Sequence, residues 1–266
     1  MNFYYTITDE SKAYFGDKGQ NTNYVRNRTR SLEKFWKMQN EINVRGQHNN
    51  TLDDKGKIVQ ILTFWYGLPS DLAEGYADFF VDYVNPNSSF LIETPLLSFD
   101  GFAIALDGFL GQEDLIVIGD GLVELLSETG VEDKIVWTGI LSHEWAHHIQ
   151  FNNDYMDFWD NLFDNEPERT RASELEADFM ASYYMTHKRG ATYNWKRVKD
   201  FLELFFNIGD CSFENDGHHG TPTQRMESSR LGYELANGTK KKGKILSQEE
   251  VHNAFVAVLD DIVEVP

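Results

Sequence analysis

The stretch that decides how this chain is interpreted is His143-Glu144-Trp145-Ala146-His147. Residues four positions apart on an α-helix lie on the same face, so the two histidines can bind one metal ion from one side. The carboxylate of Glu144 then points toward the fourth coordination position, where a catalytic zinc holds its water. The pentad therefore predicts a hydrolytic metal site carried on a helix.

The residues around the pentad favour a buried helix. An apolar run, Ile135-Val136-Trp137-Thr138-Gly139-Ile140-Leu141-Ser142, precedes it, and Ile149 and Phe151 follow at helical spacing. A chance match would be expected on a solvated helix rich in charge. The alternative is that His143 and His147 are ordinary packed or surface histidines.

A second predicted helix offers the third ligand that a catalytic zinc needs. It includes Arg171-Ala172-Ser173-Glu174-Leu175-Glu176-Ala177-Asp178, with Pro167 suited to its first turn and Gly190 to its C-terminal cap. The chain between the two motifs is long enough for this helix to return antiparallel to the first.

Two acidic residues of this second helix share one face. Glu174 and Asp178 are four positions apart, so Glu174 can bind the metal while Asp178 accepts the free N–H of a ligating histidine. Glu176 projects about 200° away and is the weaker ligand candidate. The alternative is a solvated acidic helix face.

Together these motifs resemble the gluzincins, in particular the neutral zinc metallopeptidase family and the catalytic cores of CAAX prenyl protease-like membrane peptidases (minigluzincins). Residues 101–107 and 115–122 look like the strands and helix start that precede the active helix there. His219-Gly220-Thr221-Pro222-Thr223-Gln224-Arg225 is similar to their His-Gly-Thr-x-x-Gln-Arg signature. The resemblance covers residues 96–232.

The resemblance implies a zinc metallopeptidase with one Zn²⁺ per chain and a peptide or protein substrate. The implied metal ligands are His143, His147 and Glu174, the implied catalytic residues are Glu144, His219 and Arg225, and Asp178 supports a ligand. The donors considered for the oxyanion of the reaction are His219, His218, Arg225 and Tyr183. Two alternatives stay open: a noncatalytic zinc-containing binding module, and a zinc hydrolase of a small amide.

Composition limits the partners and the compartment. A net charge of −19 argues against nucleic acid. The single cysteine, Cys211, excludes an intrachain disulfide and a cysteine-based zinc cluster. No apolar stretch reaches transmembrane length, and residues 1–20 lack the features of a signal peptide. We expect a soluble protein, cytoplasmic as written, or secreted or periplasmic if the chain is a processed mature form; the oligomeric state stays open.

We predict an α+β, zincin-like fold with a small antiparallel or mixed sheet over the active-site helix, a second helix carrying Glu174, and extra helices at both ends. The expected division is a mainly helical extension over residues 1–95, a metallopeptidase core over 96–235 and a C-terminal helix over 236–266.

Several elements are expected outside the motifs. The patterns predict helical spacing over residues 22–45, a strand-like or buried segment over 58–66, and a helix over 70–84 capped by a serine after Pro69. Residues 115–118 form a strand that could bind a peptide if it lies at a sheet edge. The last helix begins at a capping box of Ser247 and Glu250.

Overall fold

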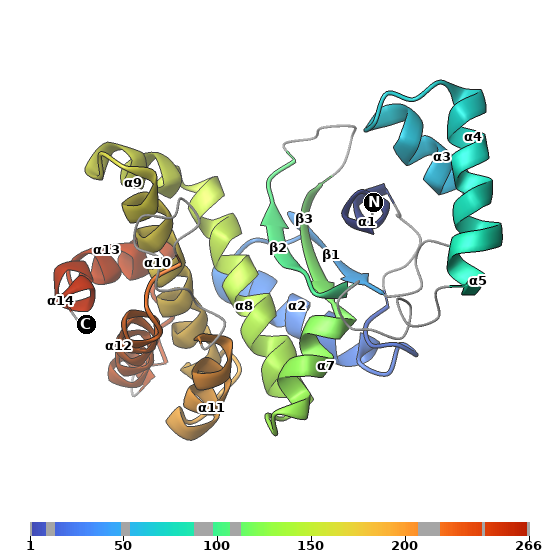
Figure 1. Ribbon diagram of the computed structural model, residues 1–266. Helices are drawn as coiled ribbons and strands as arrows, with labels where there is room; N and C mark the ends of the chain where they lie inside the picture. The colour runs from blue at the N-terminus through green and yellow to red at the C-terminus, as the bar shows by residue number, and fades with distance from the viewer. Residues whose placement is uncertain are drawn as a thin grey trace. The chain divides into compact units, whose positions relative to one another are not determined.

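A computed structural model describes residues 2–8, 14–48, 54–87, 98–106, 113–206, 219–240 and 243–264. Over these residues the chain is a mostly helical α+β protein with a small three-stranded mixed sheet (Figure 1). It forms two compact units. One comprises Met1–Val25, Val44–Phe102 and Val117–Leu125, and the other comprises Arg26–Asn43, Ala103–Ile116 and Leu126–Pro266. The division expected near residues 95 and 235 stays a prediction.

The three strands are β1 (Ile42–Gln47), β2 (Gly101–Ile104) and β3 (Asp114–Gly119), in the order β1-β3-β2. The strand expected over residues 115–118 is therefore present, but it occupies the central position and hydrogen-bonds to a strand on each side. Its backbone groups are taken up by these neighbours, so the idea that a peptide adds to this strand at a sheet edge is wrong.

The first unit contains a helical layer made of α1 (Asn2–Thr8), α3 (Lys55–Phe64), α4 (Ser70–Asp78), the π-helical turn η1 (Phe79–Val84) and α5 (Asn85–Asn87). Helix α3 packs against α1 and α4. The hydrophobic core between these three helices is formed by Tyr5, Ile58, Ile61, Leu62, Ala73 and Ala77. The helix α7 (Asp120–Glu128) begins where the sequence predicted a helix start after the strand.

Three local predictions for the amino-terminal half need correction. The segment over 58–66, expected to be strand-like or buried, is not a strand: it lies mostly in helix α3, which buries Ile58, Ile61 and Leu62. Asp54 caps this helix by accepting a hydrogen bond from the backbone N–H of Lys57 at 3.2 Å. The helical pattern over 22–45 ends early: α2 spans Thr22–Trp36, and Ile42 begins strand β1. Helix α4 takes Pro69 itself as its N-cap, with no side-chain cap, so the predicted serine cap is wrong.

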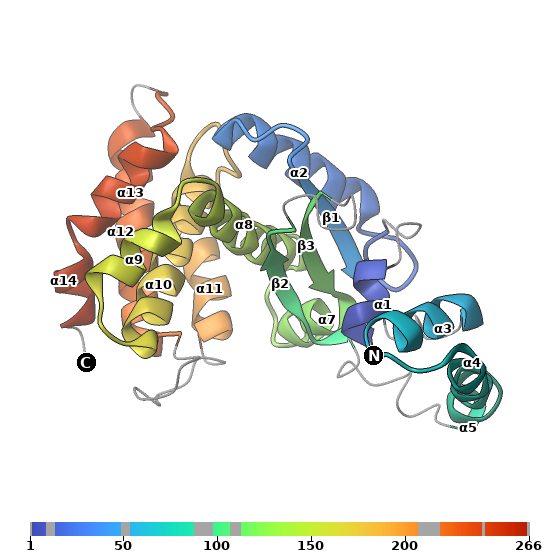
Figure 2. The same cartoon turned by 90° about the horizontal axis from the view of Figure 1, so that it is seen from above.

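The second unit is built around a long buried helix. Besides most of α2, this unit contains α8 (Asp133–Asn152), α9 (Tyr155–Leu162), α10 (Glu166–Thr186), α11 (Trp195–Phe206), α12 (Pro222–Lys240), α13 (Gln248–Val256) and α14 (Leu259–Val263). In both views α10 lies between α8 and α12 (Figures 1 and 2), and it packs against both. Helix α11 packs against α8 and α12, and α13 packs against α10.

Two glycines allow these helices to approach closely. A Cβ atom on Gly139 of α8 would lie 2.3 Å from the ring of Phe201 in α11. A Cβ atom on Gly232 of α12 would lie 2.2 Å from the carbonyl oxygen of Phe179 in α10. Glycine weakens a helix by about 1 kcal/mol relative to alanine, so its presence at both positions reflects this contact between helices.

Helix ends agree with the sequence in part. The side chain of Asn165 caps α10 by accepting from the backbone N–H of Glu168 at 3.0 Å, and Pro167 lies in the first turn as predicted. The helix ends before His187, so Gly190 is not its cap. The capping box that begins α13 at Ser247 is confirmed. Among the described residues, no helix combines the length and apolar character needed to span a membrane.

Candidate metal centre

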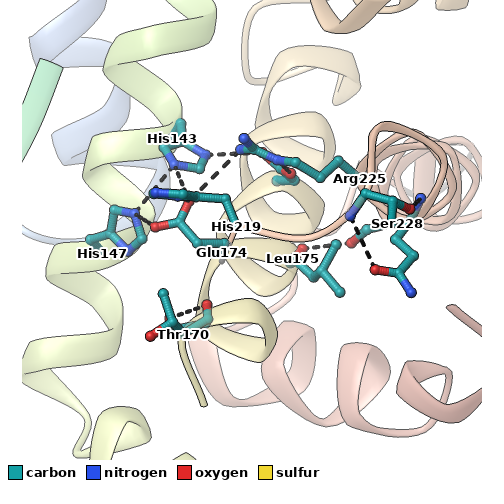
Figure 3. Close-up of polar contacts among 12 residues, drawn as sticks. His143, His147, Thr170, Glu174, Leu175, His219, Arg225 and Ser228 are labelled. Carbon is teal, nitrogen blue, oxygen red and sulfur yellow. Dashed lines mark hydrogen bonds and ion pairs between the residues drawn. The ribbon is translucent and has the colours of Figure 1, made fainter. Parts of the chain in front are cut away.

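The two histidines of the pentad and the first acid of the second motif meet between two helices. His143 and His147 project from one face of α8 toward Glu174 on α10 (Figure 3). One donor atom from each of the three side chains lies within 4.8 Å of the others. Within the described part of the chain, this is the group of histidine and carboxylate side chains able to hold a metal ion.

The distances between these donors are close to those around one small ion. The Nε2 atoms of the two histidines are 3.2 Å apart. Oε2 of Glu174 lies 3.2 Å from Nε2 of His143, and its Oε1 lies 3.5 Å from Nε2 of His147. Ligand atoms about 2.0–2.1 Å from a tetrahedral Zn²⁺ would be about 3.3 Å apart. The donor set therefore fits a small divalent ion with nitrogen and oxygen ligands.

A buried acid fixes the ring of His143. The Nδ1 atom of His143 lies 3.0 Å from Oδ1 of Asp178, which is the contact predicted from the sequence. Arg225 holds the same carboxylate with two hydrogen bonds, from Nε to Oδ2 at 2.7 Å and from Nη2 to Oδ1 at 2.9 Å. Because this carboxylate only accepts, Nδ1 carries a proton, and Nε2 is the nitrogen that faces Glu174 and could bind a metal ion.

A residue that the sequence interpretation missed fixes the ring of His147. Oε1 of Gln150 lies 2.8 Å from Nδ1 of His147, so Nε2 of this ring also presents its lone pair toward the centre. The signal was available, since Gln150 is three positions after His147 and therefore neighbours it on the helix surface. The two lone pairs and the Glu174 carboxylate converge on one point.

The electrostatics of the centre favour a positive charge at that point. Burial alone would lower the pKa of His143, but its hydrogen bonds with Asp178 and Glu174 outweigh burial and raise the pKa to about 10. Burial would raise the pKa of Glu174, but the nearby histidines hold it well below its usual range. The raised pKa of His143 and the lowered pKa of Glu174 both show that the carboxylates around this point favour a positive charge there.

Glu144 and His219 are the two remaining residues for which a catalytic role is predicted. Glu144 follows His143 on α8 and is only 6% exposed, and burial raises its pKa. His219 is exposed and its Nδ1 lies 3.2 Å from Oε2 of Glu174, which raises the pKa of the imidazole mainly through this hydrogen bond. It extends over the same carboxylate as the two histidines of α8 (Figure 3). Roles for both groups in a reaction stay predictions.

The segment from His219 to Arg225 has a local structural explanation. Gly220 adopts a left-handed conformation with φ of +92°, which glycine allows without strain. Thr221 and Gln224 form a reciprocal pair: each backbone N–H donates to the side chain of the other, at 3.2 and 3.1 Å. This capping box begins α12 and directs Arg225 toward Asp178. The threonine and glutamine three positions apart signalled it, but our sequence interpretation did not use that spacing.

Two of the other candidates, Tyr183 and Glu176, are not brought to the centre. Tyr183 is fully buried, and its hydroxyl accepts a hydrogen bond from the backbone N–H of Leu246 at 2.9 Å. Glu176 lies outside the group able to hold a metal ion, as its helix face predicted. His218 and Cys211 lie outside the described residues.

Comparisons of the chain with protein-family models, with curated proteins and with solved structures found no match.

Proposed function

We propose that this protein is a zinc-dependent metallopeptidase of zincin-like fold, in which His143, His147 and Glu174 hold one Zn²⁺. The observation that carries the proposal is the convergence of these three side chains, with one donor atom of each within 4.8 Å of the others and both imidazole rings hydrogen-bonded through Nδ1. Two imidazoles with one carboxylate, leaving a fourth position open, is a ligand set of hydrolytic rather than structural zinc sites.

Zinc bound there would supply Lewis acidity, which polarises a carbonyl and makes water nucleophilic near neutral pH. Glu144, buried next to His143, accepts the proton of the attacking water and passes it to the leaving amine. His219 is exposed and can donate a hydrogen bond to the oxyanion. Arg225 is a positioning residue, because Nε and Nη2 of its guanidinium are engaged by Asp178.

The test combines metal content with cleavage. Purified protein is analysed for bound metals by mass spectrometry and is then incubated with a mixed peptide library, with and without a chelator. We expect about one zinc per chain and chelator-sensitive cleavage. Glu144→Gln should keep its zinc and lose nearly all turnover, because it changes the base and none of the three ligands.

Each other outcome has a distinct meaning. Zinc without cleavage of any peptide would favour the noncatalytic binding module and would contradict the peptidase. Cleavage of small amides but not of peptides would favour the small-amide hydrolase. Full turnover by Glu144→Gln would contradict the role of this base, and absence of any bound divalent metal would contradict the centre.

A further inference from the structure

A network of buried polar side chains extends away from the candidate metal centre, behind His147. It begins at Gln150 on α8, continues to Glu176 on α10, and ends at Trp159 on α9 and His252 on α13. Glu176 and Gln150 are fully buried, and His252 is 6% exposed. None of these residues belongs to the group able to hold a metal ion.

Only one orientation of the Gln150 side-chain amide satisfies the hydrogen-bonding groups around it. Its nitrogen lies 2.8 Å from the carbonyl oxygen of Ser173 and 2.9 Å from Oε2 of Glu176. Both partners are acceptors, so the nitrogen of the amide, with its two hydrogens, must face them. The oxygen of Gln150 must then face Nδ1 of His147, 2.8 Å away. An amide flip, which such side chains often allow, would place donors against His147 and two acceptors against the amide oxygen.

The carboxylate of Glu176 is itself held by donors from three helices. It accepts from Nε2 of Gln150 at 2.9 Å, from Nε1 of Trp159 at 3.1 Å and from Nδ1 of His252 at 2.6 Å. The ring of Tyr155 stacks on His252 with 3.8 Å between centroids, which restricts the imidazole. Burying a carboxylate costs several kcal/mol unless it is fully hydrogen-bonded, and here the donors that satisfy it also fix its position.

We propose that Gln150 is a positioning residue for the metal centre: held by Glu176 and the carbonyl of Ser173, its amide oxygen keeps the proton of His147 on Nδ1. The Nε2 lone pair of His147 is then always directed at the metal position. This inference rests on the proposed metal-binding function of the centre and is independent of the reaction. It assigns the two histidines different supports, since a carboxylate holds His143 and a neutral amide holds His147.

The proposal predicts how metal affinity responds to changes that touch no ligand. Gln150→Met preserves length and apolar volume and removes the acceptor of His147. We expect the affinity for Zn²⁺ to fall about 10 to 100-fold, the usual effect of removing such a support. Glu176→Leu leaves the carbonyl of Ser173 to hold the amide, so we expect a smaller loss of affinity together with a larger loss of stability.

A matched control separates positioning from general destabilisation. Thr138 is also a fully buried polar residue of α8, and its hydroxyl donates to the backbone oxygen of Lys134 at 2.7 Å. The same hydroxyl lies 3.3 Å from the hydroxyl of Tyr193. Thr138→Val therefore removes buried hydrogen bonds of the same helix at a residue outside the group able to hold a metal ion. We expect it to lower stability and to leave the affinity for Zn²⁺ unchanged.

The experiment measures zinc affinity by chelator competition and the imidazole protonation sites by ¹⁵N NMR, on the full chain. In the wild type we expect Nδ1 of His147 to be protonated with and without Zn²⁺; in metal-free Gln150→Met we expect the proton to be shared between both nitrogens. Unchanged zinc affinity and an unchanged proton position in Gln150→Met would overturn the proposal. Failure of the wild type to bind zinc would instead contradict the metal centre, so the two failures are distinguishable.

Discussion

Replacing Asp178 by leucine tests the centre most directly, because this carboxylate has two separate tasks. It accepts from Nδ1 of His143 at 3.0 Å, and it neutralises Arg225 through two hydrogen bonds. Asp178 is 2% exposed and Arg225 is 4% exposed, so water can replace neither partner. Asp178→Leu leaves a buried guanidinium without its main partner, beside Oε2 of Glu174 at 3.8 Å.

The loss of stability follows from the loss of that partner. Breaking one side of a buried pair costs about 3–5 kcal/mol. For a chain of this size, each kcal/mol shifts Tm by about 2–4 °C, so Asp178→Leu should lower the Tm of the metal-free protein by about 6–20 °C. Arg225→Met should cost a similar amount, since it leaves the carboxylate buried. The double variant Asp178→Leu/Arg225→Met should recover most of this loss, because an apolar pair of similar volume often replaces a buried ion pair without penalty.

Metal affinity should follow a different order from stability. Asp178→Leu and the double variant both leave Nδ1 of His143 without its acceptor, so both should bind Zn²⁺ about 10 to 100-fold more weakly. Arg225→Met retains that acceptor and should bind zinc within a few-fold of the wild type. The assays are thermal unfolding followed by tryptophan fluorescence, with Trp137 and Trp145 buried in α8 as reporters, and chelator competition for zinc.

Either of two results would refute this reasoning. If zinc affinity and Tm fell and recovered together across the three variants, Asp178 would act on the metal only through the stability of the fold. If Asp178→Leu left Tm unchanged, the buried pair with Arg225 would be absent in solution.

Three further changes probe the packing, the helix ends and the ligand chemistry. Gly139→Ala should destabilise the protein by about 1–3 kcal/mol in denaturant unfolding, because its Cβ would meet the buried ring of Phe201. The control Gly238→Ala in α12 meets nothing within 4 Å, and should be neutral or stabilising by up to about 1 kcal/mol; equal effects would contradict the contact between α8 and α11. Ser247→Ala should cost about 1 kcal/mol and lower Tm, since it removes the capping box of α13; no change would mean that this cap is frayed. The affinity for Zn²⁺, measured by chelator competition, should fall steadily as the pH is lowered from about 10, because the ion must displace a proton from His143, whose pKa is raised to about 10; retention of zinc at about pH 4 would exclude histidine ligands.

The parts of the centre that the sequence could predict are those set by local helix geometry. The spacing of His143 and His147 and that of Glu174 and Asp178 each place two side chains on one face, whatever the rest of the chain does. Local helix geometry therefore fixes the face on which each pair lies. Two such faces on adjacent helices can meet in only a few arrangements. The same spacing argument places Gln150 next to His147, although Gln150 lies outside the pentad.

The remaining parts depend on contacts between distant segments. An apolar run such as residues 58–66 fits a buried strand or a short helix equally well, and the cap of Asp54 decides for the helix. The central position of β3 depends on its pairing with β1 and β2. The sequence pattern of β3 alone does not encode this pairing. The partnership of Glu176 with His252 joins residues 76 positions apart. Such pairings are decided by tertiary packing and not by local pattern.

The buried charges of the second unit show why metal binding and folding should be coupled. Asp178 and Arg225 neutralise each other, and Glu176 is satisfied by donors that include His252. These groups are therefore stable without a metal ion. Glu174 differs, because its oxygens lie against the Nε2 atoms of both histidines, which are neutral when they act as ligands. A divalent ion there offsets the charge of this carboxylate. Such an ion would bind the folded unit far better than the unfolded chain, and would stabilise the fold in proportion to that preference.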